Sequence, residues 1–172
     1  MGPEDVAALL FEPPPMVDGE LRVVLAARVP GDPAQDWVPA YHFELYVERP
    51  VAGRVEGRIG PIGHVNLRIG DTKHVLMHAG HIGYSVDPAW RGRRFAARAA
   101  MMVIAFAHAI GRQTLWITCN PDNAASLRTL EILGAERVEE VAVPPGTEMY
   151  ARGERRKVRF RLRRSRACDG SK

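Results

Sequence analysis

The sequence has few cysteines: only Cys119 and Cys168 occur among its 172 residues. Two cysteines so far apart do not suggest the disulfide framework of a small secreted protein, and they fit a reducing compartment. The chain begins with an acidic, proline-rich segment, whereas a secretory signal needs basic residues and then an apolar run. We therefore expect a cytoplasmic protein, with Cys119 in the core at the end of a buried strand.

Long apolar runs are absent too. The most apolar stretch, residues 95–110, is interrupted by one arginine and one histidine and is shorter than the roughly 20 residues that cross a bilayer. This pattern predicts no membrane association. A chain of this length can instead bury one core, so we expect a single domain over residues 1–172, loosely ordered at 1–20 and 165–172.

Most of the chain has no large excess of positive or of negative charge. Residues 152–166 hold nine of the 24 Lys and Arg residues and one of the 20 acidic residues, which leaves 15 basic and 19 acidic residues elsewhere. In this basic segment Val158, Phe160 and Leu162 alternate with arginines, which predicts a terminal strand with one solvated arginine face. No aromatic stacking platform is interleaved, so nucleic-acid binding is not expected.

The sequence does contain alternating strand and helix patterns. Strands are predicted at 21–29, 41–48, 63–70, 80–86, 114–119 and 157–163. Helices are predicted from Phe95 to Gly111 and from Asp122 or Asn123 to Gly134. A strand, helix, strand order implies parallel pairing of the strands on either side of the first helix, within a mixed sheet. The fold class is therefore α+β.

Residues 91–96, "RGRRFA", lie between an expected strand and the start of an expected helix. Helix N-termini expose unpaired N–H groups and a positive dipole end, so a pyrophosphate would bind well there. Gly92 and Ala96 allow close approach of a ligand, and three arginines add positive charge. Taken alone, the stretch is equally consistent with a solvated basic turn.

Together with "GHIGYSVDP" before it and "NPDNAASLRTLEILGA" after it, this loop resembles the GNAT family of acetyl-CoA-dependent N-acyltransferases. The phosphate loop of that family reads Gln/Arg-x-x-Gly-x-Gly/Ala. Here Arg91 fills the first position and Ala96 the last, while Arg94 replaces the middle glycine. The resemblance covers residues 80–136, and the expected strands within 41–70 are compatible with the family's sheet.

The resemblance implies the acyl-CoA N-acyltransferase fold: a mixed, mostly antiparallel sheet of about six or seven strands, flanked by helices, with a splayed parallel pair. It also implies acetyl-CoA as the cofactor, with direct acetyl transfer in a ternary complex to a primary amine of a small molecule, peptide or protein. The cofactor-binding residues that it implies are Tyr84, Ser85, Val86, Arg91, Gly92, Arg93, Arg94, Phe95, Ala96, Asn120, Asn123 and Ser126.

Catalytic groups follow from the same resemblance. The thioester carbonyl needs a hydrogen-bond donor as negative charge develops on it, and the backbone N–H of Val86 is the candidate. Many relatives protonate the leaving thiolate with a tyrosine in the second helix, but Leu130 occupies that position here. The pattern looks more like the branch of ribosomal-protein N-terminal acetyltransferases, in which a serine serves. Ser126 is that candidate, and a local capping bond is its alternative role.

The sequence identifies a general base less clearly than the other catalytic groups. His81 is a candidate base near the acceptor amine, with His64 and His78 as rivals. A hydrogen-bonded structural histidine is the alternative for His81. The spacing of His74, His78 and His81 suits a metal site on a helix face, but Gly80 and the strand pattern argue against a helix there. No carboxylate or cysteine completes a ligand set, so no metal site is expected.

Arg94 leaves two outcomes open. If its position needs a positive φ, the arginine is strained and CoA binds weakly. If φ is ordinary, the side chain can pair with a CoA phosphate, and this is the outcome we expect. The acceptor should be selected by loops at 31–40, 49–62 and 141–154. Two rival functions are a non-catalytic CoA-binding module and a nucleic-acid-binding protein, and an edge strand or the second helix could support a homodimer.

Overall fold

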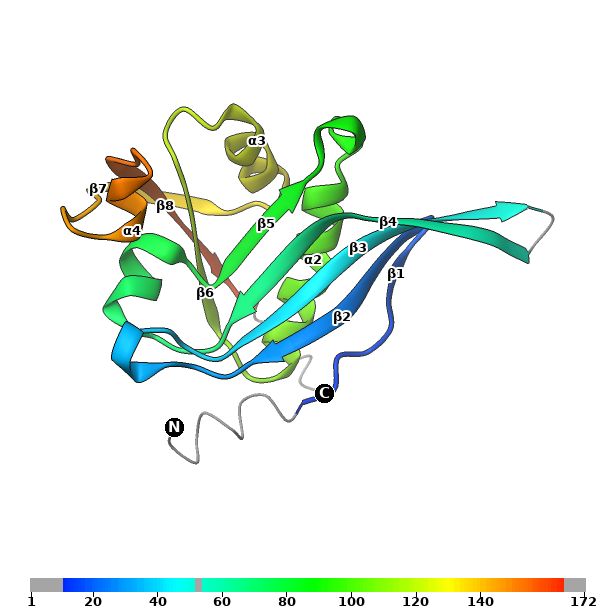
Figure 1. The fold of residues 1–172 in the computed structure, drawn as a ribbon, viewed down its shortest axis with the longest axis horizontal. Coiled ribbons are helices and arrows are strands. Elements are labelled where there is room, and N and C mark those ends of the chain that lie inside the picture. Colours follow the sequence, from blue (N-terminus) through cyan, green and yellow to red (C-terminus); the bar gives the residue numbers. More distant parts are fainter. Residues whose placement is uncertain (1–10, 52–53, 166–172) are drawn as a thin grey trace, which may run out of the picture.

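The computed structural model describes residues 11–51 and 54–165, which form one eight-stranded mixed sheet with helices packed against it (Figure 1). The strands are β1 (Met16–Asp18), β2 (Leu21–Val29), β3 (Ala40–Val51), β4 (Arg54–Arg68), β5 (Ile82–Val86), β6 (Thr114–Cys119), β7 (Glu136–Ala142) and β8 (Arg156–Arg163). The α-helices are α2 (Phe95–Ala109), α3 (Ala124–Ile132) and α4 (Glu148–Ala151). Short helical turns are η1 (Pro33–Gln35), η2 (Val75–Ala79) and η3 (Pro88–Trp90).

The strand order is β1-β2-β3-β4-β5-β6-β8-β7, and the pairing of β5 with β6 is the parallel one. β5 pairs with β4 along its whole length, from Ile82 to Val86. Its register with β6 holds only at Ile82 and Ile117, so the two strands part beyond that point. The expected α+β fold with a splayed parallel pair is confirmed, with eight strands in place of six or seven.

The core lies between the sheet and α2, which runs behind the central strands in Figure 1. Alternate residues of the strands face it, and Tyr41 and Phe43 of β3 meet Phe106 of α2 edge-on, with ring centres 5.2 and 6.3 Å apart. Small buried side chains such as Ala97 and Ala100 bring α2 close to the sheet. This packing fixes the N-terminus of α2 beside the end of β5.

Several elements differ from the sequence-based expectation. Residues 49–62, expected as a loop, belong largely to the long β3–β4 hairpin, whose Pro50, Gly57 and Gly60 obscured the strand pattern. Residues expected to be loosely ordered at 1–20 include β1, which pairs with β2. The other residues of that prediction, 1–10 and 166–172, lie outside the described residues, as does Cys168.

The basic strand β8 is not terminal in the sheet, because it lies between β6 and β7. The expected solvated arginine face is therefore wrong. Arg159 is only 7% exposed: it pairs with Glu139 of β7, and its Nε donates to the Leu76 carbonyl at 2.9 Å. Arg161 likewise pairs with Glu136 of β7 at 2.8 Å. Acidic residues of β7 thus neutralise much of the positive charge by which this segment could attract a nucleic acid.

Candidate functional site

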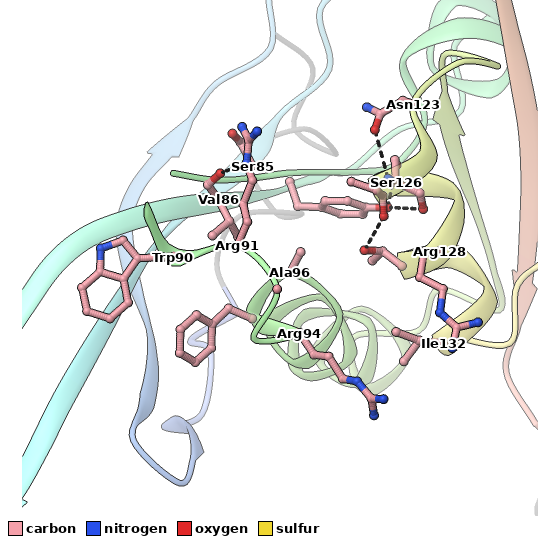
Figure 2. A pocket seen from close by; sticks show the side chains of 15 residues that line it. Ser85, Val86, Trp90, Arg91, Arg94, Ala96, Asn123, Ser126, Arg128 and Ile132 are labelled. Atoms are coloured by element: carbon pink, nitrogen blue, oxygen red, sulfur yellow. Dashed lines mark hydrogen bonds between the residues drawn. The ribbon is translucent and has the colours of Figure 1, made fainter. Parts of the chain in front are cut away.

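A pocket of about 520 Å³ lies where the carboxyl end of β5, the N-terminus of α2 and the first turns of α3 meet (Figure 2). The expected cofactor-binding residues that line it are Tyr84, Ser85, Val86, Arg91, Gly92, Arg94, Phe95, Ala96, Asn123 and Ser126. Sequence reasoning missed Ala125, Thr129 and Ile132, which also line it. Their three- and four-residue spacing places them on one face of α3, and that spacing is the signal that could have found them.

Two expected cofactor-binding side chains do not line this pocket. The guanidinium of Arg93 lies over the ring of Trp90, 5.0 Å from its centre. Asn120 lines a second pocket of about 350 Å³ between the β6–α3 loop and the turn before β8. Its Oδ1 is buried and has no hydrogen-bond partner among the described residues.

The loop before α2 presents a row of unbonded backbone N–H groups. The first hydrogen bond of α2 runs from the Arg98 N–H to the Arg94 carbonyl. Within the described part of the chain, the N–H groups of residues 92–97 donate to no acceptor. Gly92 has a φ of 80°, which curls the loop and costs a glycine little. Free N–H groups at a helix N-terminus form an anion-binding cradle.

Arg94 has the conformation that we did not expect. Its φ of 59° and ψ of 20° lie in the left-handed region, so the prediction of an ordinary φ is wrong. Arg94 is the residue before the first residue of α2, at the position where the family's phosphate-loop pattern has glycine. Its side chain has no hydrogen bond, ion pair or ring contact among the described residues. Figure 2 shows Arg94 and Arg128 extending outward on the same side of the pocket.

The pairing of β5 with β4 decides which of its backbone groups face the pocket. The Arg68 N–H donates to the His81 carbonyl, and the Asp87 N–H donates to the Ile62 carbonyl. Bonded pairs alternate along an antiparallel ladder, so Ser85 directs its backbone groups to β4, while Tyr84 and Val86 direct theirs away from it. Of the three expected cofactor-binding residues of β5, Ser85 therefore has no free backbone group on the pocket side.

The two backbone groups of Val86, on the side where β5 and β6 part, differ in their partners. Its carbonyl accepts a hydrogen bond from Arg91 Nε at 2.9 Å, which holds the Arg91 side chain against the strand end. Its N–H donates to no acceptor among the described residues outside the strand ladders. The Val86 N–H is thus available as a donor at the wall of the pocket.

A buried hydroxyl pair bridges β5 and α3 (Figure 2). Ser126 is 9% exposed, and its Oγ lies 2.9 Å from the Tyr84 hydroxyl. Burial raises the pKa of Tyr84 to about 12. The helix cap is made by Asn123, whose Oδ1 accepts from the Ser126 N–H at 3.0 Å, so capping does not use the serine hydroxyl. Leu130, at the position of the missing acid, is fully buried in the core.

His81 is fully buried at the start of β5, outside the residues that line the pocket. Its Nδ1 accepts from the Trp116 N–H at 2.9 Å, and its Nε2 donates to Asp71 Oδ1 at 2.9 Å. Burial lowers its pKa, although the bond to Asp71 raises it. These contacts are those expected of a hydrogen-bonded structural histidine, the alternative to a catalytic base. His64 and His78 do not line the pocket either.

The histidine-rich segment is helical in part, contrary to expectation. Residues 73–79 form a helical turn that ends at Gly80. The ring centres of His74 and His78 are 6.2 Å apart, and His78 Nε2 donates to the Ala142 carbonyl at 3.1 Å. In residues 11–51 and 54–165, no group of three His, Cys, Asp or Glu side chains is arranged to hold a metal ion. No helix in these ranges is long and apolar enough to span a membrane.

Comparison with known proteins gives one family match. Residues 4–136 match the family model described as an acetyltransferase (GNAT) domain. No curated protein matches the chain significantly.

Similar solved structures share the fold. The ribosomal-protein-S5-alanine acetyltransferase from Vibrio fischeri is 22% identical, with a TM-score of 0.52 over 72% of this chain and 61% of that one. The microcin C7 self-immunity acetyltransferase MccE, solved with acetyl-CoA and AMP, is 16% identical, with a TM-score of 0.50 over 73% and 61%. RimL, a ribosomal L7/L12 α-N-protein acetyltransferase solved with coenzyme A, is 13% identical, with a TM-score of 0.52 over 72% and 62%. The chain thus spans less than two thirds of each structure's length.

Proposed function

Because the chain belongs to the GNAT acetyltransferase family, we propose that it is an N-acetyltransferase that uses acetyl-CoA. The acceptor in this proposal is a primary amine of a small molecule, a peptide or a protein. The ribosomal-protein acetyltransferases among the similar structures favour a protein amine, and MccE is the counterexample of a different acceptor.

One observation carries the proposal: Gly92, Arg94, Phe95 and Ala96, whose N–H groups are unbonded, line one pocket together with Val86, whose N–H is free. The N–H cradle suits the diphosphate of coenzyme A, and the gap between β5 and β6 suits its extended arm. A pocket of about 520 Å³ is within the range of small-molecule sites. The residues present therefore fit the cofactor that the family uses.

Acetyl-CoA supplies an activated acetyl thioester: its C–S bond breaks as a C–N bond to the acceptor forms, the electron pair leaves with sulfur, and the amine proton passes to solvent. The Val86 N–H would bind the carbonyl oxygen as charge develops there. Ser126 Oγ would donate a hydrogen bond to the departing sulfur. The described lining residues include no carboxylate and no imidazole. A water molecule is therefore the route by which the amine loses its proton.

Calorimetry with CoA, followed by thiol release from acetyl-CoA across a panel of amines, tests the proposal. We expect CoA binding at micromolar concentration and thiol release with at least one class of amine, including protein N-termini. No binding at high micromolar CoA would overturn the proposal. Binding without thiol release from any amine would favour the non-catalytic module.

A further inference from the structure

The side chain of Tyr84 links two elements of the site. Its hydroxyl crosses from β5 to the first turn of α3 and lies 2.9 Å from Ser126 Oγ. It also lies 3.4 Å from the Ser126 carbonyl. Both residues line the pocket that we assign to acetyl-CoA. The usual helix position for an acid holds the buried Leu130, and the Tyr84 hydroxyl contacts α3 one turn earlier, at Ser126.

Either hydroxyl of this pair can donate to the other, and the neighbouring groups show what each arrangement allows. A serine hydroxyl has one hydrogen to donate and two lone pairs. Both atoms of Ser126 that face Tyr84, Oγ and the carbonyl oxygen, can accept from the tyrosine hydroxyl. Burial keeps Tyr84 protonated at neutral pH, because it raises the pKa to about 12. When Tyr84 donates to Ser126 Oγ, the hydrogen of Ser126 is free for another acceptor.

The Ser126 hydroxyl already lies next to one sulfur atom, that of Cys119. Cys119, at the end of β6, is buried, which raises the pKa of its thiol, while a hydrogen bond from Ser126 lowers it. Thr129 of α3 uses its own hydroxyl to bond the Ala125 carbonyl at 3.0 Å. The Ser126 hydroxyl thus already has the Cys119 thiol, at the end of β6, as an acceptor, and the sulfur of coenzyme A would take that hydrogen in its place.

We propose that Tyr84 is a positioning residue for acetyl transfer: its hydroxyl donates to Ser126 Oγ and directs the Ser126 hydrogen toward the sulfur of coenzyme A. The proposal rests on the proposed function, because it needs coenzyme A in this pocket. A hydrogen bond to the sulfur favours the thiolate over the thiol and so helps the sulfur to leave. If Tyr84 has only a structural role, its hydrogen bond holds β5 against α3 and has no effect on the sulfur of coenzyme A.

The pKa of the CoA thiol, measured while CoA is bound, separates these two roles. It can be followed by thiolate absorbance, as the difference between protein with and without CoA. For the unaltered chain we expect a pKa below that of free CoA. Tyr84→Phe should raise it by about one unit. Ser126→Ala should raise it at least as much, and the double variant no further, because the two hydroxyls act in series.

Tyr46→Phe is the matched control. Tyr46 lies on β3, outside the pocket, and its hydroxyl donates to Glu44 at 2.6 Å, so this variant also loses one tyrosine hydrogen bond. It should leave the bound thiol pKa unchanged. In turnover assays, Tyr84→Phe should lower kcat about tenfold and change KM for acetyl-CoA less than twofold.

The outcomes distinguish this proposal from the proposed function. CoA binding with the same thiol pKa in Tyr84→Phe as in the unaltered chain would overturn the role of Tyr84, and so would additive effects of the two substitutions. Failure of the unaltered chain to bind CoA would overturn both proposals. A thiol pKa that depends on Tyr84, without acetylation of any amine, would leave the hydrogen-bond assignment standing and overturn the transferase.

Discussion

At position 94 the backbone and the side chain have opposite preferences. The φ of 59° favours glycine, and an arginine there costs about 1–2 kcal/mol. The guanidinium, however, stands at the mouth of the pocket beside unbonded N–H groups and has no acidic partner among the described residues. An unpaired guanidinium in such a place is suited to bind a phosphate. We infer that the strain is retained because the charge contributes to binding.

Arg94→Gly should therefore change stability and affinity in opposite directions. We expect the free energy of unfolding to rise by about 1 kcal/mol, because the strain is relieved. The dissociation constant for CoA should increase about three- to tenfold, more at low salt than at high salt. Urea unfolding and calorimetry measure the two effects. Arg93→Ala removes the same charge from a side chain that stacks on Trp90 and should change affinity less than twofold. Tighter binding of CoA to Arg94→Gly would contradict the pairing.

His81 predicts a dependence of stability on pH. Burial lowers its pKa in the folded protein below the ordinary value of 6.5. The unfolded chain therefore binds the proton more readily, so stability is present above pH 6.5 and is lost as the pH falls from there toward the folded pKa. Urea unfolding between pH 7.5 and 5 should show this loss, with a shallower slope for His81→Gln. Equal slopes in the two proteins would assign the loss to other groups.

The family could be predicted from residues 80–136, but the conformation of Arg94 and the burial of His81 could not. The left-handed φ at Arg94 is set by how α2 packs on the sheet, and a short motif does not contain that information. His81 is buried because it contacts Trp116 and Asp71, one 35 residues ahead of it and the other 10 residues behind it. Such partners are brought together by the fold, so local sequence leaves both roles of a histidine open.

Among the elements, β7 and β8 form through their pairing with each other. β7 has the sequence ERVEEVA, and most of its residues are exposed, so no apolar alternation marks it as a strand. Its acids lie directly opposite arginines of β8: Glu136 opposite Arg161 and Glu139 opposite Arg159. Cross-strand pairs of opposite charge stabilise such a ladder. The strand was therefore not predictable from its own residues, because its partners come 20 to 25 residues later.

The two arginines of this ladder should differ in their contribution to stability. The Arg159 side chain is 8% exposed, lies 4.1 Å from the centre of the Trp116 ring and donates to the Leu76 carbonyl. Arg159→Ala should lower the free energy of unfolding by about 2–3 kcal/mol, because it removes the buried side chain that packs on Trp116 and takes the donor away from the part-buried Leu76 carbonyl. Arg161→Ala, at a more exposed pair, should cost less than about 1 kcal/mol. Urea unfolding of both variants tests this, and equal losses would contradict it.

At the scale of the whole molecule, the separation of β5 from β6 depends on the strands that pair with their outer edges. β5 is held by β4 on its other edge, and β6 is held by β8 from Thr114 to Cys119. Val158 and Phe160 of β8 are buried in the same core as Ile117 of β6. The order of strands and helices from β2 to β6 was predictable, but the insertion of β8 between β6 and β7 was not, since it is a long-range pairing. The family match ends at residue 136, before this support.

A chain shortened after Ala142 should therefore fail to fold, although it contains the whole segment that matches the family model. Without β8, the outer edge of β6 loses its ladder, and the core loses the buried Val158 and Phe160. Burying two such side chains contributes about 3–6 kcal/mol, which is comparable to the whole stability of a small domain. We expect the shortened chain to be insoluble or to unfold without a cooperative transition, whereas the full chain shows one. Cooperative unfolding together with CoA binding by the shortened chain would show that β6 keeps its place without β8.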